Sequence, residues 1–354
     1  MKALRAFVAA VALALVVATF LPLWPTDLWW VRMMAFPRLQ ATTLLLLAGA
    51  LLLFSLRGRS PVMLGLLGSV VAAVGFNAVK LAPYMANSAP TIVQTCPADR
   101  SFSVMVANVQ LGSRSADALM EIIRERQPDL LLAMETDEWW DRQLKALSDV
   151  MPHAVQRITG SYYGIHLLSR LPLADRRTKA PVEQDAPALS VDVRLASGQD
   201  IRLIGLHPRP PTPGQSSTGR DAQLMWAALE ARRGDRPVVV AGDLNAVPWE
   251  AVAERMRRIG RLVDPRWAHG YLATFDANSS WMKWPLDQVL VSATLDVTGA
   301  ARLPSIGSDH YPYIATICAR DGTLDVREMK DGDITAANDA IEAALRGKEE
   351  VVGD

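Results

Sequence analysis

The sequence is short of several features that would assign it to a specialised class. Neither charge is in excess, because 37 basic residues match 37 acidic ones, and half of the 354 residues are hydrophobic. This composition excludes a disordered chain and a polycationic tail. Aromatic residues make up only 6% of the chain, cysteine occurs twice, and no internal repeat is visible. A chain of this length leaves room for one large core and a further segment.

The balanced total charge hides three segments of different composition. Residues 1–95 carry seven basic residues and one acidic residue, residues 96–320 carry 26 of each, and residues 321–354 carry four basic and ten acidic residues. The first segment is therefore basic, the second neutral and the third acidic. The parts that we expect are a membrane anchor over 1–85, a linker over 86–100, a folded domain over 101–320, and an acidic, solvated tail over 321–354 with a short helix at 336–345.

Three uncharged runs fill most of the first segment. They cover residues 6–26, 39–56 and 60–79, which are 21, 18 and 20 residues long. About 20 apolar residues in a helix cross the hydrocarbon layer, so these runs predict three transmembrane helices and bilayer contact through residues 6–79. A cleaved signal peptide is the alternative for the first run. No clear small-residue cleavage site follows it, and two further apolar runs come close behind.

The basic residues around these runs predict how the helices are oriented. One side of the expected membrane has Lys2, Arg5, Arg57 and Arg59, and the other side has Arg32, Arg38 and Lys80. Lys and Arg favour the cytoplasmic side of a membrane. We therefore expect a multi-pass protein of a bacterial-type inner membrane, with its amino terminus inside and everything after residue 85 outside the cytoplasm.

The two cysteines bear on the same question. Cys96 precedes the first strand-like run of the neutral segment, and Cys318 ends the last one. A disulfide bond between them would close the two ends of the domain and would suit an oxidising compartment. Two buried thiols in a cytoplasmic domain are the other interpretation. The sequence leaves both open, because the bond requires Cα atoms within about 7 Å of each other.

The neutral segment alternates short apolar runs with amphipathic ones, which predicts a mixed α/β domain with many strands. Strands are expected at residues 101–107, 129–134, 162–168, 189–195, 201–206, 237–241, 286–292 and 311–318. Helices are expected at residues 115–126, with Ser115 as the cap, and at 221–232 and 249–259. The run at 208–219 is rich in Pro, Gly, Ser and Thr and predicts a surface loop.

Polar side chains stand at the ends of these expected strands. They are Asn108, Glu135, His207, Asp243, Asn245, Asp287, Asp309 and His310. Each alone could be a turn residue, a helix cap or a satisfied buried histidine. If the last two strands run antiparallel to the first four, all of them meet along one rim of the sheets. Polar groups on a rigid rim are a common way to build a functional site.

The motifs around these residues resemble those of the endonuclease/exonuclease/phosphatase superfamily. They are VMVANV, LLLAMET, GIHLLSRLPL, LHPRP, VVVAGDLNAVPWE, PLDQVLVS and GSDHYPYIATI, in that order over residues 102–318. The resemblance implies an α/β fold in which two packed mixed sheets are flanked by helices as a four-layer sandwich. It also implies hydrolysis of a phosphoester with the help of a divalent metal.

The resemblance further implies a role for each polar residue. Glu135 would be the main ligand of Mg²⁺, or of Mn²⁺ in its place, and Asn108 and Asp309 would complete or support the metal site. Asp243 would orient or deprotonate the attacking water, and Asn245 would donate to the developing oxyanion. His310, held by Asp287, would stabilise charge on the phosphate, and His207 would contact the phosphate or protonate the leaving oxygen.

The phosphodiester substrate stays open at this stage, because one scaffold hosts several substrates. A nuclease acting on DNA or RNA outside the cytoplasm is one option, although its domain would usually be basic. A lipid-headgroup phosphodiesterase, similar to the sphingomyelinases, is another, since an anchor would keep lipid close by. An inactive, membrane-tethered binding module is the alternative of another class. No protein partner is predicted.

Overall fold

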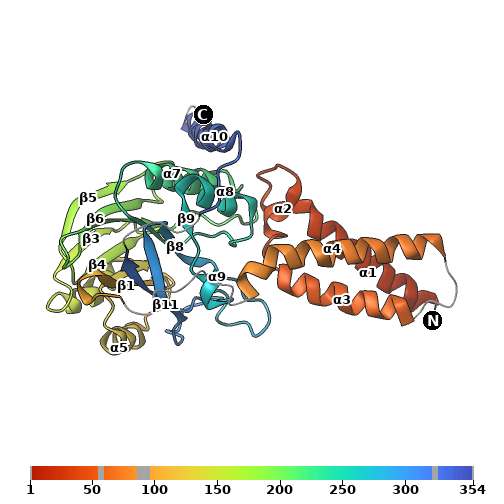
Figure 1. Ribbon diagram of the computed structural model, residues 1–354, viewed down its shortest axis with the longest axis horizontal. Coiled ribbons are helices and arrows are strands. Elements are labelled where there is room, and N and C mark those ends of the chain that lie inside the picture. Colours follow the sequence, from red (N-terminus) through yellow and green to blue (C-terminus); the bar gives the residue numbers. More distant parts are fainter. Residues whose placement is uncertain (1, 55–59, 86–95, 321–325, 353–354) are drawn as a thin grey trace.

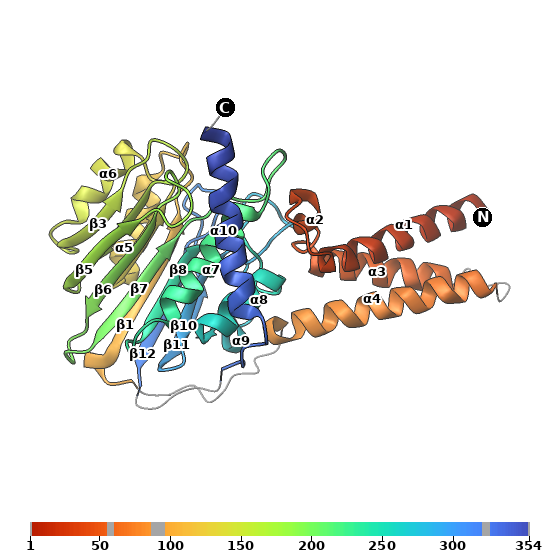
Figure 2. The same ribbon diagram turned by 90° about the horizontal axis from the view of Figure 1, so that it is seen from above.

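A computed structural model describes residues 2–54, 60–85, 96–320 and 326–352 of the chain. Two six-stranded sheets pack face to face, and helices cover both outer faces (Figure 1). A bundle of helices from the first 85 residues projects from one side of this sandwich (Figure 2). The expected fold class, two packed mixed sheets flanked by helices, is confirmed.

Both sheets are mixed. The first has the order β11 (Leu295–Arg302), β12 (Tyr313–Ala319), β1 (Ser101–Asn108), β2 (Leu130–Met134), β4 (Ile165–Ser169) and β3 (His153–Arg157). The second has the order β5 (Leu173–Lys179), β6 (Ala188–Arg194), β7 (Asp200–Leu206), β8 (Val238–Asp243), β10 (Asp287–Ser292) and β9 (Leu262–Val263). β1 runs parallel to β2 and β7 parallel to β8, whereas β12 is antiparallel to β1 and β10 is antiparallel to β8.

Alternating side chains of the strands build the layers. Val104 and Val106 of β1 enter the core between the sheets, and Met105 faces the helices outside. This alternation follows from the period of two along a strand. The helices on the first sheet are α5 (Ala116–Arg126) and α6 (Glu138–Leu144), followed by η3 (Lys145–Leu147), and those on the second are α7 (Thr218–Arg232) and α8 (Ala251–Gly260). Two short elements, η2 (Ala98–Arg100) and α9 (Arg266–His269), complete the domain.

Some elements differ from the sequence-based expectations. β3, β5, β9 and β11 were not predicted, and β5 shows why: its middle residues, ADRRT, are all exposed, so no apolar alternation marks this edge strand. Charged residues on edge strands are common because they discourage pairing with other chains. Ser115 occupies the N-cap position of α5, but its side chain makes no capping hydrogen bond.

The amino-terminal helices are α1 (Lys2–Phe20), η1 (Leu21–Leu23), α2 (Trp29–Met33), α3 (Arg38–Phe54) and α4 (Pro61–Met85). Two of the three expected spans, at Ala3–Leu23 and Pro61–Met85, are long and apolar enough to cross a membrane. A candidate span needs at least 18 residues, and α3 has 17. The prediction of three spanning helices is therefore corrected to two. Length and composition alone do not distinguish such helices from a signal sequence.

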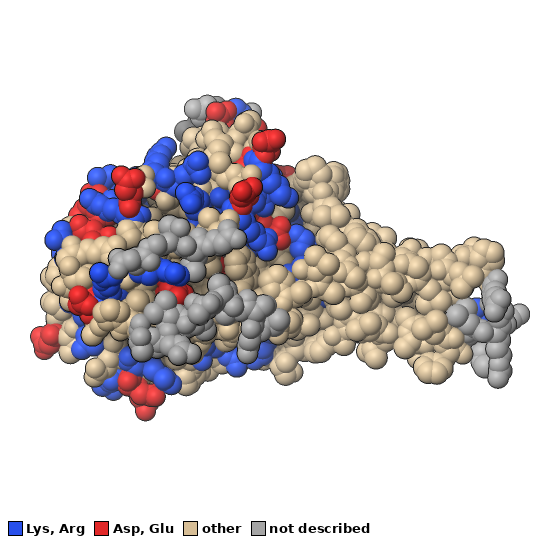
Figure 3. All heavy atoms as spheres, viewed as in Figure 1, with Lys and Arg blue, Asp and Glu red and all other residues tan. Residues whose placement is uncertain are grey.

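These helices bury small apolar faces against one another and leave large ones uncovered. Ala12, Leu45 and Ala73 are fully buried in the bundle, whereas Val71 and Val79 are 71% and 75% exposed. Hardly any charged side chain lies on the viewed face of the bundle, in contrast to the sandwich (Figure 3).

The carboxyl-terminal helix is longer than expected and is not solvated throughout. α10 spans Asp333–Val352 and packs on α7, with Ala337 fully buried and Ala344 nearly so. Asp333 at its start is paired with Arg258 of α8 at 2.8 Å. An apolar stripe on a helix favours packing over solvation, so the interpretation of this segment as a solvated spacer is wrong for α10.

A disulfide bond joins Cys96 to Cys318 at the end of β12, and their Cα atoms are 5.9 Å apart. The interpretation with two free thiols is therefore contradicted. β1 and β12 pair in the first sheet with Ser101 opposite Cys318. The bond consequently fixes the entry of the chain into the sandwich beside its exit.

Candidate active site

The eight polar residues singled out in the sequence gather at one rim of the sandwich. β1, β2, β7 and β8 end there, and the antiparallel strands β10 and β12 begin there. In the second sheet Asp287 lies directly opposite Asp243. In the first sheet the last pair of β1 and β2 is Asn108 with Met134, which brings Glu135 next to Asn108. The convergence expected from the strand ends is therefore present.

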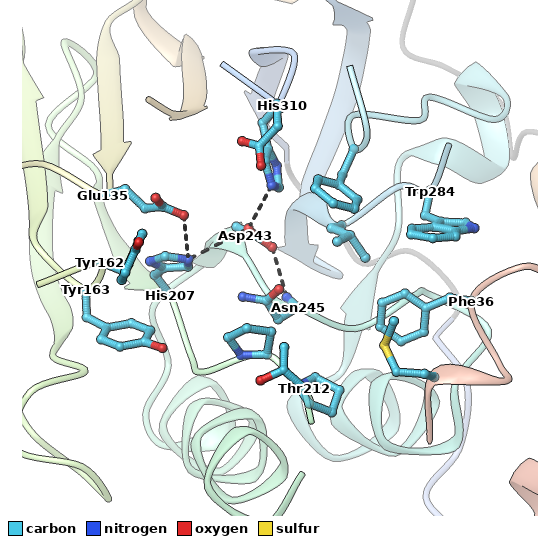
Figure 4. A pocket seen from close by; sticks show the side chains of 16 residues that line it. Phe36, Glu135, Tyr162, Tyr163, His207, Thr212, Asp243, Asn245, Trp284 and His310 are labelled. Atoms are coloured by element: carbon cyan, nitrogen blue, oxygen red, sulfur yellow. Dashed lines mark hydrogen bonds and ion pairs between the residues drawn. The ribbon is translucent and has the colours of Figure 1, made fainter. Parts of the chain in front are cut away.

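Asp243 lies at the centre of this group (Figure 4). Its Oδ2 atom is 3.5 Å from His310 Nε2 and 3.8 Å from His207 Nε2, and it accepts a hydrogen bond of 3.2 Å from Asn108 Nδ2. Its Oδ1 atom accepts a hydrogen bond of 3.0 Å from the backbone N–H of Asn245. Since Asp243 is only 1% exposed, its charge acts on these groups with little screening by water.

Glu135 is held in place by donors on both of its oxygens. Asn108 Nδ2 donates to Oε1 at 2.9 Å, and the backbone N–H of Leu111 donates to Oε2 at 3.0 Å. The Oδ1 atom of Asn108 accepts from the backbone N–H of Gln110, which fixes how its amide is turned. Asn108 thus supports the two carboxylates as a donor. Glu135 itself has φ of 60°, a left-handed conformation that costs free energy and is found mostly at functional sites.

A chain of hydrogen-bonded side chains, Thr136, His166 and Asp141, lies next to Glu135. The next residue, Thr136, contacts His166 Nδ1 through its hydroxyl at 2.8 Å, and His166 Nε2 contacts Asp141 Oδ1 at 3.2 Å. Thr136 is fully buried and His166 almost so. This packing restricts the backbone that carries Glu135, and no feature of the sequence motifs had indicated it.

His310 is oriented by Asp287. Its Nδ1 atom lies 2.7 Å from Asp287 Oδ2, so Nε2 is directed at Asp243. Burial alone would lower the pKa of His310, but the negative charges of Asp287 and Asp243 raise the pKa to about 10. The imidazole is therefore positively charged at neutral pH.

Asp309 adds another carboxylate to the same cavity. Burial raises its pKa; the positive charge of His310 opposes this shift, and the charges of Glu135 and Asp243 add to it. Asp309 is thus a partly buried carboxylate close to both Glu135 and Asp243.

Asn245 is held by its surroundings on two sides. Its Nδ2 atom donates to the carbonyl of Pro208 at 2.9 Å, and its own carbonyl accepts from Arg220 at 2.9 Å. Its φ is 49°, again left-handed. An amide nitrogen has two hydrogens, so one remains for a ligand in the cavity.

These groups open on a cavity of about 360 Å³ that has one polar and one apolar side. Its apolar lining includes Met33, Phe36, Phe275, Trp284 and Leu286. Figure 4 shows Phe36 and Trp284 together on one side of the cavity, away from Glu135 and His207. Met33 and Phe36 come from the amino-terminal part of the chain and carry no motif, so no pattern could have assigned them to the site.

A family comparison agrees with this geometry. The model described as "Endonuclease/Exonuclease/phosphatase family" matches residues 105–310, which is more than half of the chain. The chain belongs to this family. No curated protein sequence matches it significantly.

Solved structures show the family fold. A humanized TDP2 from D. rerio is 18% identical, with a TM-score of 0.53, over 62% of this chain and 99% of that one. D. rerio TDP2 complexed with single-strand DNA product is 16% identical, with a TM-score of 0.53, over 61% and 98%. An endonuclease/exonuclease/phosphatase from Beutenbergia cavernae is 18% identical, with a TM-score of 0.52, over 64% and 74%. At these identities the likeness concerns the fold.

The residues of the rim fit a divalent cation, as the family implies. Ligand atoms of Asp243, Asp287 and His310 lie within 4.8 Å of one another, but His310 and Asp287 already bind each other. The carboxylates of Glu135, Asp243 and Asp309 face the cavity, and hard oxygen ligands suit Mg²⁺ and Mn²⁺. Burial chiefly raises the pKa of Asp309, and a cation bound beside this carboxylate would favour its charged form.

Proposed function

We propose that the protein is a membrane-anchored, divalent-metal-dependent phosphodiester hydrolase. One observation supports it most directly: Oδ2 of the buried Asp243 lies within 3.8 Å of two imidazoles and an amide contributed by different strand ends. Cleavage of a phosphoester needs an activated water, neutralised phosphate charge and help for the leaving oxygen. Groups suited to each task line this cavity.

The residues divide these tasks among themselves. Asp243 orients and deprotonates the attacking water. His310, charged and held by Asp287, binds the phosphate and stabilises its growing charge. His207 contacts the phosphate or protonates the leaving oxygen, and the remaining amide hydrogen of Asn245 faces the oxyanion.

The metal site consists of oxygen ligands. Glu135 and Asp309, supported by Asn108, would hold Mg²⁺, with Mn²⁺ as a substitute, and the bound cation would neutralise charge on the phosphate. The hydrogen bonds of Asn108 and Leu111 to Glu135 keep that carboxylate turned in one direction without a cation.

The activity is tested with the full-length protein in detergent and bis(4-nitrophenyl) phosphate. We expect Mg²⁺-dependent release of nitrophenolate that a chelator abolishes. Asp243→Asn should lower kcat/KM by about 10²–10⁴-fold, because it removes the base but keeps the shape. Asp149→Asn is the matched control, since Asp149 is exposed on the sandwich. Activity of Asp243→Asn near that of the wild type would refute the assigned role.

The same assay separates the alternatives. Plasmid DNA and RNA are included because a relative was solved with single-strand DNA product. The neutral charge of residues 96–320 argues against a strong nuclease, since counterion release from phosphates requires many basic residues. Absence of turnover on every substrate with either metal would favour the inactive binding module.

The membrane part of the proposal depends on exposed apolar surface. A soluble helical bundle buries its large side chains, whereas α1, α3 and α4 expose theirs, for example Leu53 at 60% and Val71 at 71%. The disulfide bond suits an oxidising compartment. On the disulfide bond alone, because the charge pattern gives this result only with three crossings, we propose that residues 96–320 lie outside the cytoplasm of a bacterial-type cell. An alkaline phosphatase fused after residue 320 should be active and a green fluorescent protein at that point dark; the reverse pattern would place the domain inside.

A further inference from the structure

The segment between the first two long helices, residues 24–37, is part of the sandwich as well as of the bundle. We call it the connecting segment. The carbonyl of Asp27 accepts from the backbone N–H of Ser217 at 2.9 Å, and the carbonyl of Ala35 accepts from Trp249 Nε1 at 2.7 Å. Arg32, nearly buried, pairs with Glu250 at 3.0 Å. These contacts fix the segment against the loops that follow β8 and precede α7.

The connecting segment also reaches the catalytic residues through a row of aromatic rings. Phe36 meets Trp284 edge-on with ring centroids 5.7 Å apart, and Trp284 stacks on Phe275 at 5.8 Å. Phe275 in turn lies 4.8 Å from the ring of His310. Phe36 and Trp284 are 3% and 9% exposed, and both line the cavity. An apolar surface therefore begins at the membrane-proximal segment and ends beside the phosphate-binding histidine.

We infer that this surface is a subsite for the hydrocarbon chain of a membrane lipid, whose phosphoester lies in the cavity beside Asp243 and His310. We call it the apolar wall and define it as Met33, Phe36, Phe275, Trp284 and Leu286. The inference rests on the proposed function and names its substrate class. A small hydrophilic phosphodiester would leave this wall facing water, whereas a lipid chain would cover it.

Two further observations favour a lipid over a polynucleotide. Among the described residues that line the cavity there is no Lys or Arg, although a polynucleotide binds chiefly through such cations. Tryptophan side chains on the two segments that supply the wall are exposed: Trp24 and Trp30 on the connecting segment, and Trp281 on the loop that carries Trp284. Gln40 in the first turn of α3 donates to the carbonyl of Trp281 at 2.7 Å, so this loop lies level with the start of that helix. Tryptophan is enriched at that depth of a membrane protein.

The test is a chain-length series on the full-length protein in lipid nanodiscs. Methyl, butyl and hexyl 4-nitrophenyl phosphate share one leaving group and differ only in the chain. Each buried methylene should raise kcat/KM about fourfold. Burial of only two of the five additional methylenes therefore gives a hexyl-to-methyl ratio above about tenfold in the wild type. A ratio near one would overturn the subsite, while hydrolysis of the methyl ester would leave the proposed function standing. Failure to hydrolyse any of the esters would overturn both.

A matched pair of variants distinguishes binding of the alkyl chain to the apolar wall from simple partition of the ester into the bilayer. Met33 lines the cavity and is partly exposed, whereas the neighbouring Met34 is exposed and does not line it. Met33→Gln keeps the side-chain length and adds polarity, so it should lower the hexyl-to-methyl ratio severalfold. Met34→Gln should keep the wild-type ratio. Equal ratios in both variants, or a clear preference of the wild type for plasmid DNA over the hexyl ester, would overturn the inference.

Discussion

Arg220 is the residue whose replacement tests most directly how the site is built. It is fully buried at the start of α7. Its guanidinium donates to both oxygens of Glu250, at 2.6 and 3.2 Å, and to the carbonyl of Asn245 at 2.9 Å. Arg32 of the connecting segment pairs with the same carboxylate and with Asp221. One cation thus supports an active-site residue and the docking of the amino-terminal part.

The expected cost of Arg220→Met follows from this network. The change would leave two carboxylates, Glu250 and Asp221, with Arg32 as their shared partner and one buried negative charge uncompensated. Breaking a buried ion pair in this way costs about 3–5 kcal/mol of unfolding free energy. The double variant Arg220→Met/Glu250→Gln removes the orphaned charge as well, so its loss should be at least about 2 kcal/mol smaller than the sum of the single losses.

The wild type, Arg220→Met, Glu250→Gln and the double variant are unfolded in detergent, and the transition is followed by tryptophan fluorescence. Turnover of bis(4-nitrophenyl) phosphate is measured in parallel. Arg220→Met should also lower kcat by about tenfold or more, because small displacements of a site are costly. Arg346→Met is the control: this arginine and its partner Glu342 on α10 are both exposed, so its replacement should change stability by less than about 0.5 kcal/mol. Additive losses in the double variant would refute the reasoning.

Three further predictions concern acid, reductant and metal. Arg258 lowers the pKa of Asp333 to about 2, so this carboxylate stabilises the fold above its ordinary pKa near 4 by about 2 kcal/mol, and the gain is lost as the pH falls from 4 through 2. The difference in urea midpoint between the wild type and Asp333→Asn should become smaller as the pH is lowered from 6 to 3. A constant difference would contradict the stabilising role of the Asp333 carboxylate. Reductant should destabilise the wild type by up to about 5 kcal/mol, because Cys96 and Cys318 are 222 residues apart, and should not affect the double serine variant. Glu135→Gln should raise the Mg²⁺ concentration needed for half-maximal activity by at least about tenfold. An unchanged metal requirement would show that Glu135 is not a metal ligand.

Sequence reasoning located the site because polar residues interrupt apolar strands at their ends. Asp243 at the end of β8 and His310 before β12 could be assigned to one rim as soon as the strand directions were assumed, and the structure has those directions. Edge strands such as β5 were not predicted, since their exposed, charged residues show no apolar alternation. The left-handed φ of Glu135 also left no trace in the pattern, because non-glycine residues rarely adopt it.

The contacts of the connecting segment were beyond prediction for a different reason. Met33 and Phe36 are separated from Trp284 by about 250 positions of the chain, and the intervening residues show no pattern that would pair them. Hydropathy predicted membrane helices on either side of this segment. It could not show that the short stretch between them packs into the catalytic cavity, since apolar residues are expected there in any case.

The apolar wall is built partly by the connecting segment and partly by the sandwich. This has a practical consequence for preparing the protein. A shortened version that begins at residue 96 would keep every residue of the proposed metal and phosphate sites, yet Trp249, Trp284 and Leu286 would be uncovered. Such a fragment should aggregate, and kinetic constants measured on it would describe a cleft with one side missing. Purification with the first 85 residues in place is therefore a condition for measuring what this protein selects.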